Sequence, residues 1–197
     1  MLKIALLFLM TLLAPIPWLV TLTHLFVLKN KKKIILRILA MGLILWGATG
    51  YFAYKLSPKV FEHSFNNLTL KIIGVGVLLL AAGIEWLTQK ELGTYRLMGS
   101  SELGKKKDKL VSTGIYAYAR HPRYVEHPLW FLGLGLVTGY GALLWFALYL
   151  FLALWVSSYF EEKELIQRYG RAYLDYKNRT PAFFISPKSL GKFKYLV

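Results

Sequence analysis

Long apolar runs alternate with shorter polar segments along this chain. Residues 2–28, 34–54 and 68–87 form three such runs, and residues 125–160 form a fourth, longer block. A helix needs about 20 apolar residues to cross the hydrocarbon layer of a bilayer, so each of the first three runs is long enough for one span. The pattern therefore predicts an all-α fold, an integral membrane bundle of helices.

The fourth apolar block contains 36 residues, too many for one ordinary span and enough for two short ones. It is interrupted by Thr138-Gly139-Tyr140-Gly141, whose glycines can adopt the backbone angles of a tight turn. The block is predicted to form a short helical hairpin, which brings the total to about five transmembrane helices. Residues 1–67 would hold two spans, and residues 68–197 the third span, a polar segment, the hairpin and a polar tail, within a single membrane domain.

The first apolar run carries one charge near its start, Lys3, so a cleaved signal peptide is an alternative to a retained anchor. The apolar region of a signal peptide ends after about 7–15 residues. This run continues beyond Trp18 to Phe26, which favours a retained anchor. Pro15 and Pro17 lack the backbone N–H that a helix uses, so we expect a kink there.

The polar tail from residue 161 carries apolar side chains at helical spacing. They are Leu165, Ile166, Tyr169, Tyr173 and Tyr176. Intervals of one, three, four and three place them on one face of a helix. We therefore expect an amphipathic cytoplasmic helix that lies against the membrane or the bundle and ends at residues 178–181.

The formal net charge is +15, with 25 lysines and arginines. In the five-span arrangement Lys3, Lys55, Lys59 and Lys71 lie on one side of the membrane, and the other 21 basic residues lie on the opposite side. Because basic residues are retained in the cytoplasm, this asymmetry predicts an amino terminus outside and a carboxy terminus in the cytoplasm. Anionic membrane lipids, which attract each basic residue by about 1 kcal/mol, account for the charge without a nucleic acid partner.

A polar, aromatic segment at residues 110–124 precedes the hairpin and ends in Arg120-His121-Pro122-Arg123-Tyr124. Proline favours an extended conformation at the residue before it and suits the first turn of a helix, so the next helix is expected to begin at Pro122. Arg120 and His121 then lie at a helix amino terminus, where exposed N–H groups favour an anionic group such as a carboxylate.

Two acidic residues, Glu161 and Glu162, follow the second helix of the hairpin. Two crossings of the bilayer return the chain to the side that it left. We therefore expect the Arg-His-Pro turn and these twin glutamates on the same membrane face, within reach of a common ligand.

These motifs follow one another in a fixed order. It reads Leu110-Val111-x-x-Gly114-Ile115-Tyr116, Arg120-His121-Pro122-x-Tyr124, an apolar hairpin, Glu161-Glu162, Tyr169-Gly170-x-x-Tyr173-x-x-Tyr176 and Arg179-x-Pro181. The ordered set covers about residues 92–187 and resembles the isoprenylcysteine carboxyl methyltransferase and phospholipid methyltransferase superfamily. The resemblance implies methyl transfer from S-adenosylmethionine, with S-adenosylhomocysteine as product, in a pocket closed over by the polar tail.

The resemblance also implies which residues bind the cofactor. They are Leu110, Val111, Tyr116, His121, Pro122, Tyr124, Glu161 and Glu162. The twin glutamates would hold the polar end of the cofactor, because carboxylates accept hydrogen bonds from ribose hydroxyls or an ammonium group and suit a sulfonium cation. Arg120 or His121 would meet the cofactor's carboxylate.

This chain departs from the superfamily pattern at two places. Glu126 stands where many members have glycine, and Gly99-Ser100-Ser101 matches only in part the Gly-x-Gly element of phospholipid methyltransferases. The first departure concerns the local entrance to the next helix. The second makes phosphatidylethanolamine a less favoured acceptor.

The methyl acceptor is expected to be lipophilic and to enter from the bilayer, while the cofactor enters from the cytosol. A carboxylate or thiolate arrives ionised and needs no base, whereas an amine must first lose a proton. His121, Glu126 and His127 are the nearby candidates for that base, and Arg120, His121 and Glu126 form the candidate catalytic set. An anionic oxygen or sulfur acceptor is therefore preferred, with a phospholipid amine as the alternative.

Two other functions fit part of the pattern. A membrane reductase of the sterol-reductase type has related carboxy-terminal motifs, but it normally has a longer chain and uses a nicotinamide cofactor. A non-catalytic scaffold would bind anionic lipid through its basic faces. A metal site is not expected, because His24, His63, His121 and His127 are scattered and the chain has no cysteine.

Overall fold

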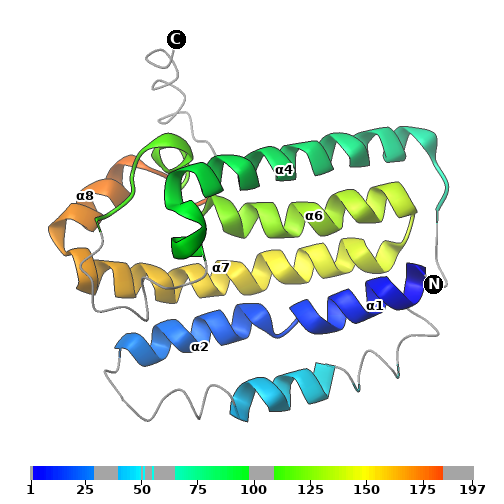
Figure 1. Ribbon diagram of the computed structural model, residues 1–197, viewed down its shortest axis with the longest axis horizontal. Helices are drawn as coiled ribbons and strands as arrows, with labels where there is room; N and C mark the ends of the chain where they lie inside the picture. The colour runs from blue at the N-terminus through cyan, green and yellow to red at the C-terminus, as the bar shows by residue number, and fades with distance from the viewer. Residues whose placement is uncertain are drawn as a thin grey trace.

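The computed structural model describes residues 2–28, 40–49, 51, 55, 65–97 and 109–183. Within these residues every element is helical (Figure 1). The elements are α1 (Leu2–Leu13), α2 (Ile16–Leu28), the helix Ala40–Thr49, α4 (Leu68–Leu97), the 3-10 helix η1 (Gly114–Ala117), α6 (Pro122–Thr138), α7 (Gly141–Tyr169) and α8 (Arg171–Arg179). The predicted all-α class is confirmed for this part of the chain.

Three helical stretches of the described chain are long and apolar enough to cross a membrane. They are Leu2–Leu25, Leu68–Leu92 and Gly141–Tyr169. α6 has 17 residues, slightly fewer than the roughly 20 that a span usually needs. Of the second predicted span, residues 34–54, the structure describes 40–49 and 51, and the Gly99-Ser100-Ser101 element lies outside the described residues.

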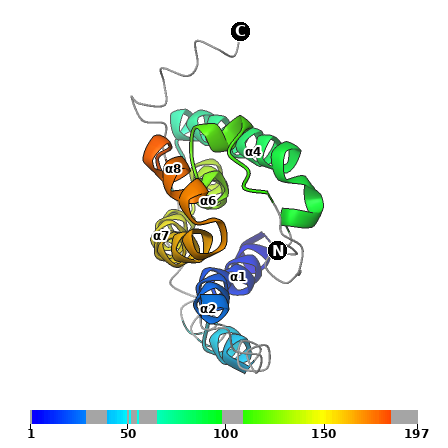
Figure 2. The same cartoon turned by 90° about the vertical axis from the view of Figure 1, so that its left-hand side faces the viewer.

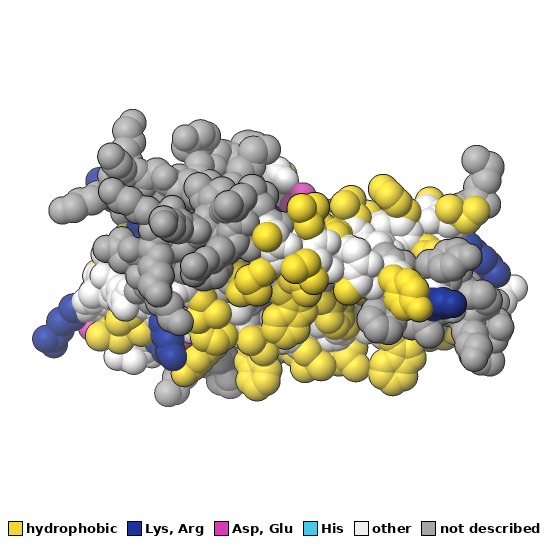
Figure 3. Space-filling model, turned by 90° about the horizontal axis from the view of Figure 1, so that it is seen from below, with side chains coloured by type: hydrophobic (Ala, Val, Ile, Leu, Met, Phe, Trp, Pro, Cys, Tyr) yellow, Lys and Arg dark blue, Asp and Glu magenta, His cyan; other side chains and the backbone are white. Residues whose placement is uncertain are grey.

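The surface of the bundle is apolar where a soluble protein would be polar. Trp145 and Leu79 are exposed on α7 and α4. Figure 3 shows hydrophobic side chains across the middle of one face, with lysine and arginine side chains toward both ends. Contiguous exposed apolar surface bounded by polar groups marks contact with a membrane or a partner. Together with the span lengths, this identifies a membrane protein.

The first anchor is bent where the proline pair predicts a kink. α1 ends at Leu13 and α2 begins at Ile16, with a turn at Ala14 and Pro15. Tyr149 of α7 donates its hydroxyl hydrogen to the Ala14 carbonyl, with the two oxygens 2.5 Å apart. The bend therefore has a hydrogen-bonding partner on the neighbouring helix.

The helices lie side by side in the order α4, α6, α7 and α2 (Figures 1 and 2). α6 runs opposite to the other three. Glycine allows α4 and α6 to approach closely, because a Cβ added to Gly74 would lie 2.9 Å from the Gly133 carbonyl oxygen. Small residues serve the same purpose in other membrane helix pairs.

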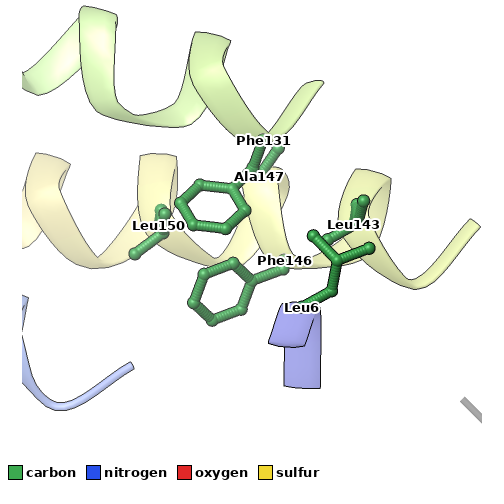
Figure 4. Close-up of a cluster of buried hydrophobic side chains, with 6 residues drawn as sticks. All are labelled: Leu6, Phe131, Leu143, Phe146, Ala147 and Leu150. Atoms are coloured by element: carbon green, nitrogen blue, oxygen red, sulfur yellow. The ribbon is translucent and has the colours of Figure 1, made fainter. Parts of the chain in front are cut away.

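The predicted helical hairpin is present as α6 and α7. Gly139 ends α6 with a positive φ of 77°, and its carbonyl accepts a hydrogen bond from the Phe65 N–H at 2.9 Å. Next to this turn lies a core of buried side chains (Figure 4): Leu6, Phe131, Leu143, Phe146, Ala147 and Leu150. The core joins α1, α6 and α7 at the end of the bundle where α1 begins.

Two helices continue further than the hydropathy pattern predicts. α4 runs to Leu97 instead of about residue 87, and α7 runs through the twin glutamates to Tyr169. The prediction of a separate amphipathic helix starting at Glu161 is therefore wrong. Hydropathy reports where a helix leaves the apolar layer, whereas the helix itself ends only where the backbone is interrupted, here at Gly170 with φ of 57°.

The remaining tail folds against the bundle. α8 ends at Arg179, as predicted from the residues at 178–181. Tyr173 and Tyr176 of α8 are buried. Of the two predicted surfaces for this apolar stripe, the bundle is therefore the one that it covers.

Candidate active site

Four elements converge at the end of the bundle where α4 and α7 finish and α6 begins (Figure 1). This end, called the site end below, contains η1, the start of α6, the last turns of α7, and α8. α6 begins at Pro122 as predicted, with His121 as its N-cap. The backbone N–H groups of Arg120 and His121 donate to the carbonyls of Pro181 and Ala182 at 2.9 and 2.8 Å. The segment after α8 thus closes over the Arg-His-Pro turn.

Arg120 holds the twin glutamates and the tail together. Its Nε donates to Glu162 Oε1 at 2.9 Å, and a second guanidinium nitrogen contacts the same oxygen. Its remaining nitrogen donates to the carbonyl of Lys177 at 3.1 Å and to that of Thr180. Lys177 Nζ lies 2.6 Å from Glu162 Oε2. Because Arg120 has these internal partners, it joins α6, α7 and α8, and a direct contact with the cofactor stays a prediction.

His121 lies between the twin glutamates. Its Nδ1 is 3.2 Å from Glu161 Oε2, and its Nε2 is 3.3 Å from Glu162 Oε1. The ring is buried and stacks on Tyr124, with centroids 5.4 Å apart. The predicted meeting of the Arg-His-Pro turn with the twin glutamates is therefore confirmed, and their roles in binding stay predictions.

The pKa of His121 is raised above its ordinary value of 6.5. Burial acts to lower it, because a charge is costly away from water, but the adjacent Glu161 and Glu162 carboxylates outweigh burial. His121 therefore holds its proton more tightly than a solvated histidine. Its contacts with both acids suit an ion-pairing role, and its predicted role as a base stays a prediction.

Two buried oxygen atoms at this end have no hydrogen-bond partner among the described residues. They are Glu161 Oε2 and the hydroxyl oxygen of Tyr173. The contact of Glu161 Oε2 with His121 is an ion pair that lacks hydrogen-bond geometry. Burial raises the pKa of Tyr173, so its hydroxyl stays a neutral donor. Because buried polar groups normally have partners, these two atoms are suited to a polar ligand.

The segment before the Arg-His-Pro turn is held by a residue that sequence reasoning missed. Glu91 lies on the part of α4 that continues beyond residue 87, and it accepts a hydrogen bond from Thr113 Oγ1 at 3.0 Å. Gly114 has φ of 54°, and a Cβ there would lie 2.0 Å from Glu91 Oε1. Continuation of the helical pattern past residue 87 was the signal that could have identified Glu91.

The predicted binding residues of this segment lie at the site end as well. Tyr116 is buried in η1, and its carbonyl accepts the Tyr176 hydroxyl hydrogen at 2.6 Å. Leu110 and Val111 are partly buried just before η1. Burial raises the pKa of Tyr116, so this phenol remains neutral. The structure thus brings the predicted segment, turn and glutamates together.

Glu126 lies one turn into α6 and has a separate partner. Its Oε2 is 2.7 Å from Nδ1 of His127, and Glu126 is buried whereas the His127 side chain is 42% exposed. The contacts that His121 makes with Glu161 and Glu162 do not involve Glu126. This acid–imidazole pair is therefore a distinct chemical unit beside the cluster.

A family model for phospholipid methyltransferases matches residues 70–172. The chain belongs to the phospholipid methyltransferase family. The matched region contains α4 from its third residue onward, η1, α6 and α7, and therefore the twin glutamates and the Arg-His-Pro turn. The resemblance noted in the sequence is thereby confirmed, and this family origin identifies the cluster as a candidate methyltransferase site.

Two curated relatives are similar to this family member. The nickel-cobalt-cadmium resistance protein NccN of Alcaligenes xylosoxydans xylosoxydans is 32% identical over 111 residues, which are 56% of this chain and 51% of that protein. Protein-S-isoprenylcysteine O-methyltransferase of Schizosaccharomyces pombe is 36% identical over 78 residues, 39% of this chain and 33% of that protein. The matches thus span about half of one relative and a third of the other.

Proposed function

We propose that this chain transfers a methyl group from S-adenosylmethionine to a lipophilic acceptor in the membrane. The observation that carries the proposal is the buried Glu161 Oε2 beside the Arg-His-Pro turn, which is ion-paired with His121 at 3.2 Å and makes no regular hydrogen bond among the described residues. Family membership supports methyl transfer as the reaction class. The isoprenylcysteine methyltransferase relative supports a lipophilic acceptor.

The donor set at the site end fits this cofactor. Glu161 Oε2 can accept a hydrogen bond from a ribose hydroxyl or an ammonium group, and the Tyr173 hydroxyl can donate one. The residues proposed to line the cofactor are Leu110, Val111, Tyr116, His121, Pro122, Tyr124, Glu161 and Glu162. When bound, S-adenosylmethionine supplies an electrophilic methyl group.

The protein's own contribution to this reaction is positioning and exclusion of water. Arg120 and Lys177 pair with Glu162, and His121 bridges Glu162 and Glu161, so the acids are held in one arrangement. Rings stacked or tilted on His121 shield the cluster. Alignment of two reactants in such a setting can supply up to roughly 7–11 kcal/mol of the barrier reduction.

An anionic acceptor agrees best with the groups available. His121 is ion-paired with the twin glutamates, and their carboxylates raise its pKa, so it is less suited than a free histidine to take a proton from an amine. A carboxylate or thiolate acceptor needs no such step. For a phospholipid amine, the Glu126–His127 pair is the proposed base. We therefore propose a carboxylate or thiolate acceptor, with a phospholipid amine as the alternative.

The proposal includes five spans with the site end in the cytoplasm. Phe65, before α4, donates to Gly139 in the hairpin turn, and Lys3 lies 5.6 Å from the Tyr140 ring centroid. The starts of α1, α4 and α7 therefore share one end, which we assign to the outside. The basic residues of α8 lie at the opposite end, as cytoplasmic retention of positive charge requires.

Equilibrium binding of radiolabelled S-adenosylmethionine to the purified full-length protein tests the proposal, with NADPH as comparator. We expect saturable binding that the isosteric Glu161→Gln substitution weakens about tenfold or more, or about 1.4 kcal/mol. The control Glu85→Gln alters an acid on α4 whose oxygen accepts from Gln89, and it should bind as the wild type does. NADPH binding would instead indicate a reductase, and binding of neither cofactor a lipid scaffold.

A further inference from the structure

A buried acid–imidazole pair joins the first anchor to α7. Nδ1 of His24 in α2 lies 2.5 Å from Oε2 of Glu164 in α7, and both side chains are almost fully buried. Ionisable groups away from water are costly in a membrane protein, and they usually pair with one another where they serve a function. The family model matches residues 70–172, so it includes Glu164 and leaves His24 outside.

The pair belongs to a longer polar contact between the two helices. Thr21 Oγ1 lies 2.6 Å from Ser157 Oγ, and both side chains are buried. Thr21 and His24 are three residues apart on α2, while Ser157 and Glu164 are seven apart on α7. These spacings keep each set on one face of its helix, so the two contacts are successive steps along one seam.

Glu161 lies on this seam between the two contacts. It follows Ser157 by four residues and precedes Glu164 by three, the spacings that place side chains on one helical face. His24 is close enough to act electrostatically on Glu161. The position of the Glu161 carboxylate therefore depends on two neighbouring helices: His121 at the start of α6 contacts it, and α2 packs along the seam on which it lies.

We infer that His24 is a positioning residue of this site: by pairing with Glu164 it fixes the rotation of α7 and so aims the Glu161 carboxylate at the cofactor. The inference rests on the proposed function. It means that the anchor preceding the family-matched region completes the cofactor site. His24 itself does not touch the reacting atoms and acts through Glu164 and Glu161.

Three variants of the full-length protein test this role by S-adenosylmethionine binding. His24→Ala removes the partner of Glu164 and should raise the dissociation constant about tenfold. His24→Gln keeps an N–H donor and should stay within about threefold of the wild type. Thr23→Ala is the matched control, because the Thr23 hydroxyl donates to the Leu19 carbonyl of its own helix. A thermal unfolding scan identifies the variants that are folded.

A cross-link separates positioning from direct participation. The chain has no cysteine, so Thr21→Cys with Ser157→Cys introduces a single possible disulfide across the seam. Formed in the His24→Ala background, it holds α2 against α7 without the imidazole. We expect it to restore binding to within about threefold of the cross-linked chain that retains His24.

Each alternative outcome overturns a specific step. If the wild type binds the cofactor and folded His24→Ala binds it with the same affinity, the positioning role is overturned. It is also overturned if a complete cross-link in the His24→Ala background does not restore binding. A cysteine pair that does not cross-link overturns the seam itself. A wild-type chain without saturable binding overturns the proposed function, and this inference with it.

Discussion

Replacement of Arg120 by alanine is expected to loosen the site end strongly. The guanidinium donates to Glu162, to the Lys177 carbonyl and to the Thr180 carbonyl, and its side chain is 9% exposed. In Arg120→Ala, Glu162 keeps Lys177 as a partner and the two carbonyls lose this donor. Removal of one member of a buried ion pair costs about 3–5 kcal/mol where it leaves an unpaired charge, and because Glu162 keeps Lys177 and His121 as partners we expect a loss near the lower end of that range.

The substitution Arg120→Lys gives the intermediate case. Lysine keeps the charge, but a single ammonium group cannot reproduce the planar fork that contacts a carboxylate and two carbonyls at once. We expect Arg120→Lys to lower the free energy of unfolding by roughly half as much as Arg120→Ala does. Arg179→Ala is the matched control on α8, because the Arg179 side chain donates to the Asp175 carbonyl at an exposed position and its removal should stay within about 0.5 kcal/mol.

Detergent-induced unfolding followed by circular dichroism measures these differences as shifts of the midpoint. Limited proteolysis at the basic residues of α8 reports whether this helix leaves the bundle first. An Arg120→Ala protein whose unfolding midpoint and proteolysis rate match those of Arg179→Ala would refute the reasoning. Such a result would mean that the attraction between Arg120 and Glu162 only offsets the free-energy cost of removing the two charges from water.

Two further predictions concern the segment and the turn that build the site. Gly114→Ala places a Cβ 2.0 Å from Glu91 Oε1 at a φ of 54°, so it should cost about 1–3 kcal/mol and weaken cofactor binding; unchanged binding in a calorimetric titration would argue against a role for this contact. The pKa of His121 is raised in the folded state, so its contribution to stability is present below its ordinary value of 6.5 and is lost as the pH rises through the folded value. The midpoint temperature of thermal unfolding should therefore fall for the wild type as the pH rises through this range, and it should change less with pH for His121→Gln. Identical dependences of the midpoint on pH in the two proteins would contradict the ion-pair assignment.

Local sequence signals determined the parts of the fold that depend on neighbouring residues. Pro122 marks the start of α6, and Gly139 marks the turn between α6 and α7. Both follow from backbone conformations that these residue types favour or allow. The hairpin then brings His121 to the twin glutamates, since two antiparallel helices return the chain to the end where it began.

The ends of the long helices and the partners of the buried ionisable groups were decided by the tertiary structure. Hydropathy marks the edge of the apolar layer, so it did not reveal that α4 continues to Glu91 and beyond. In the sequence His24 is one polar residue within an apolar run, and its partner Glu164 lies 140 residues further along the chain. Whether two such side chains meet depends on how two helices are rotated and shifted against each other. The sequence by itself therefore determined the class, the hairpin, the turn and the meeting of His121 with the twin glutamates, and helix packing decided that His24 faces Glu164.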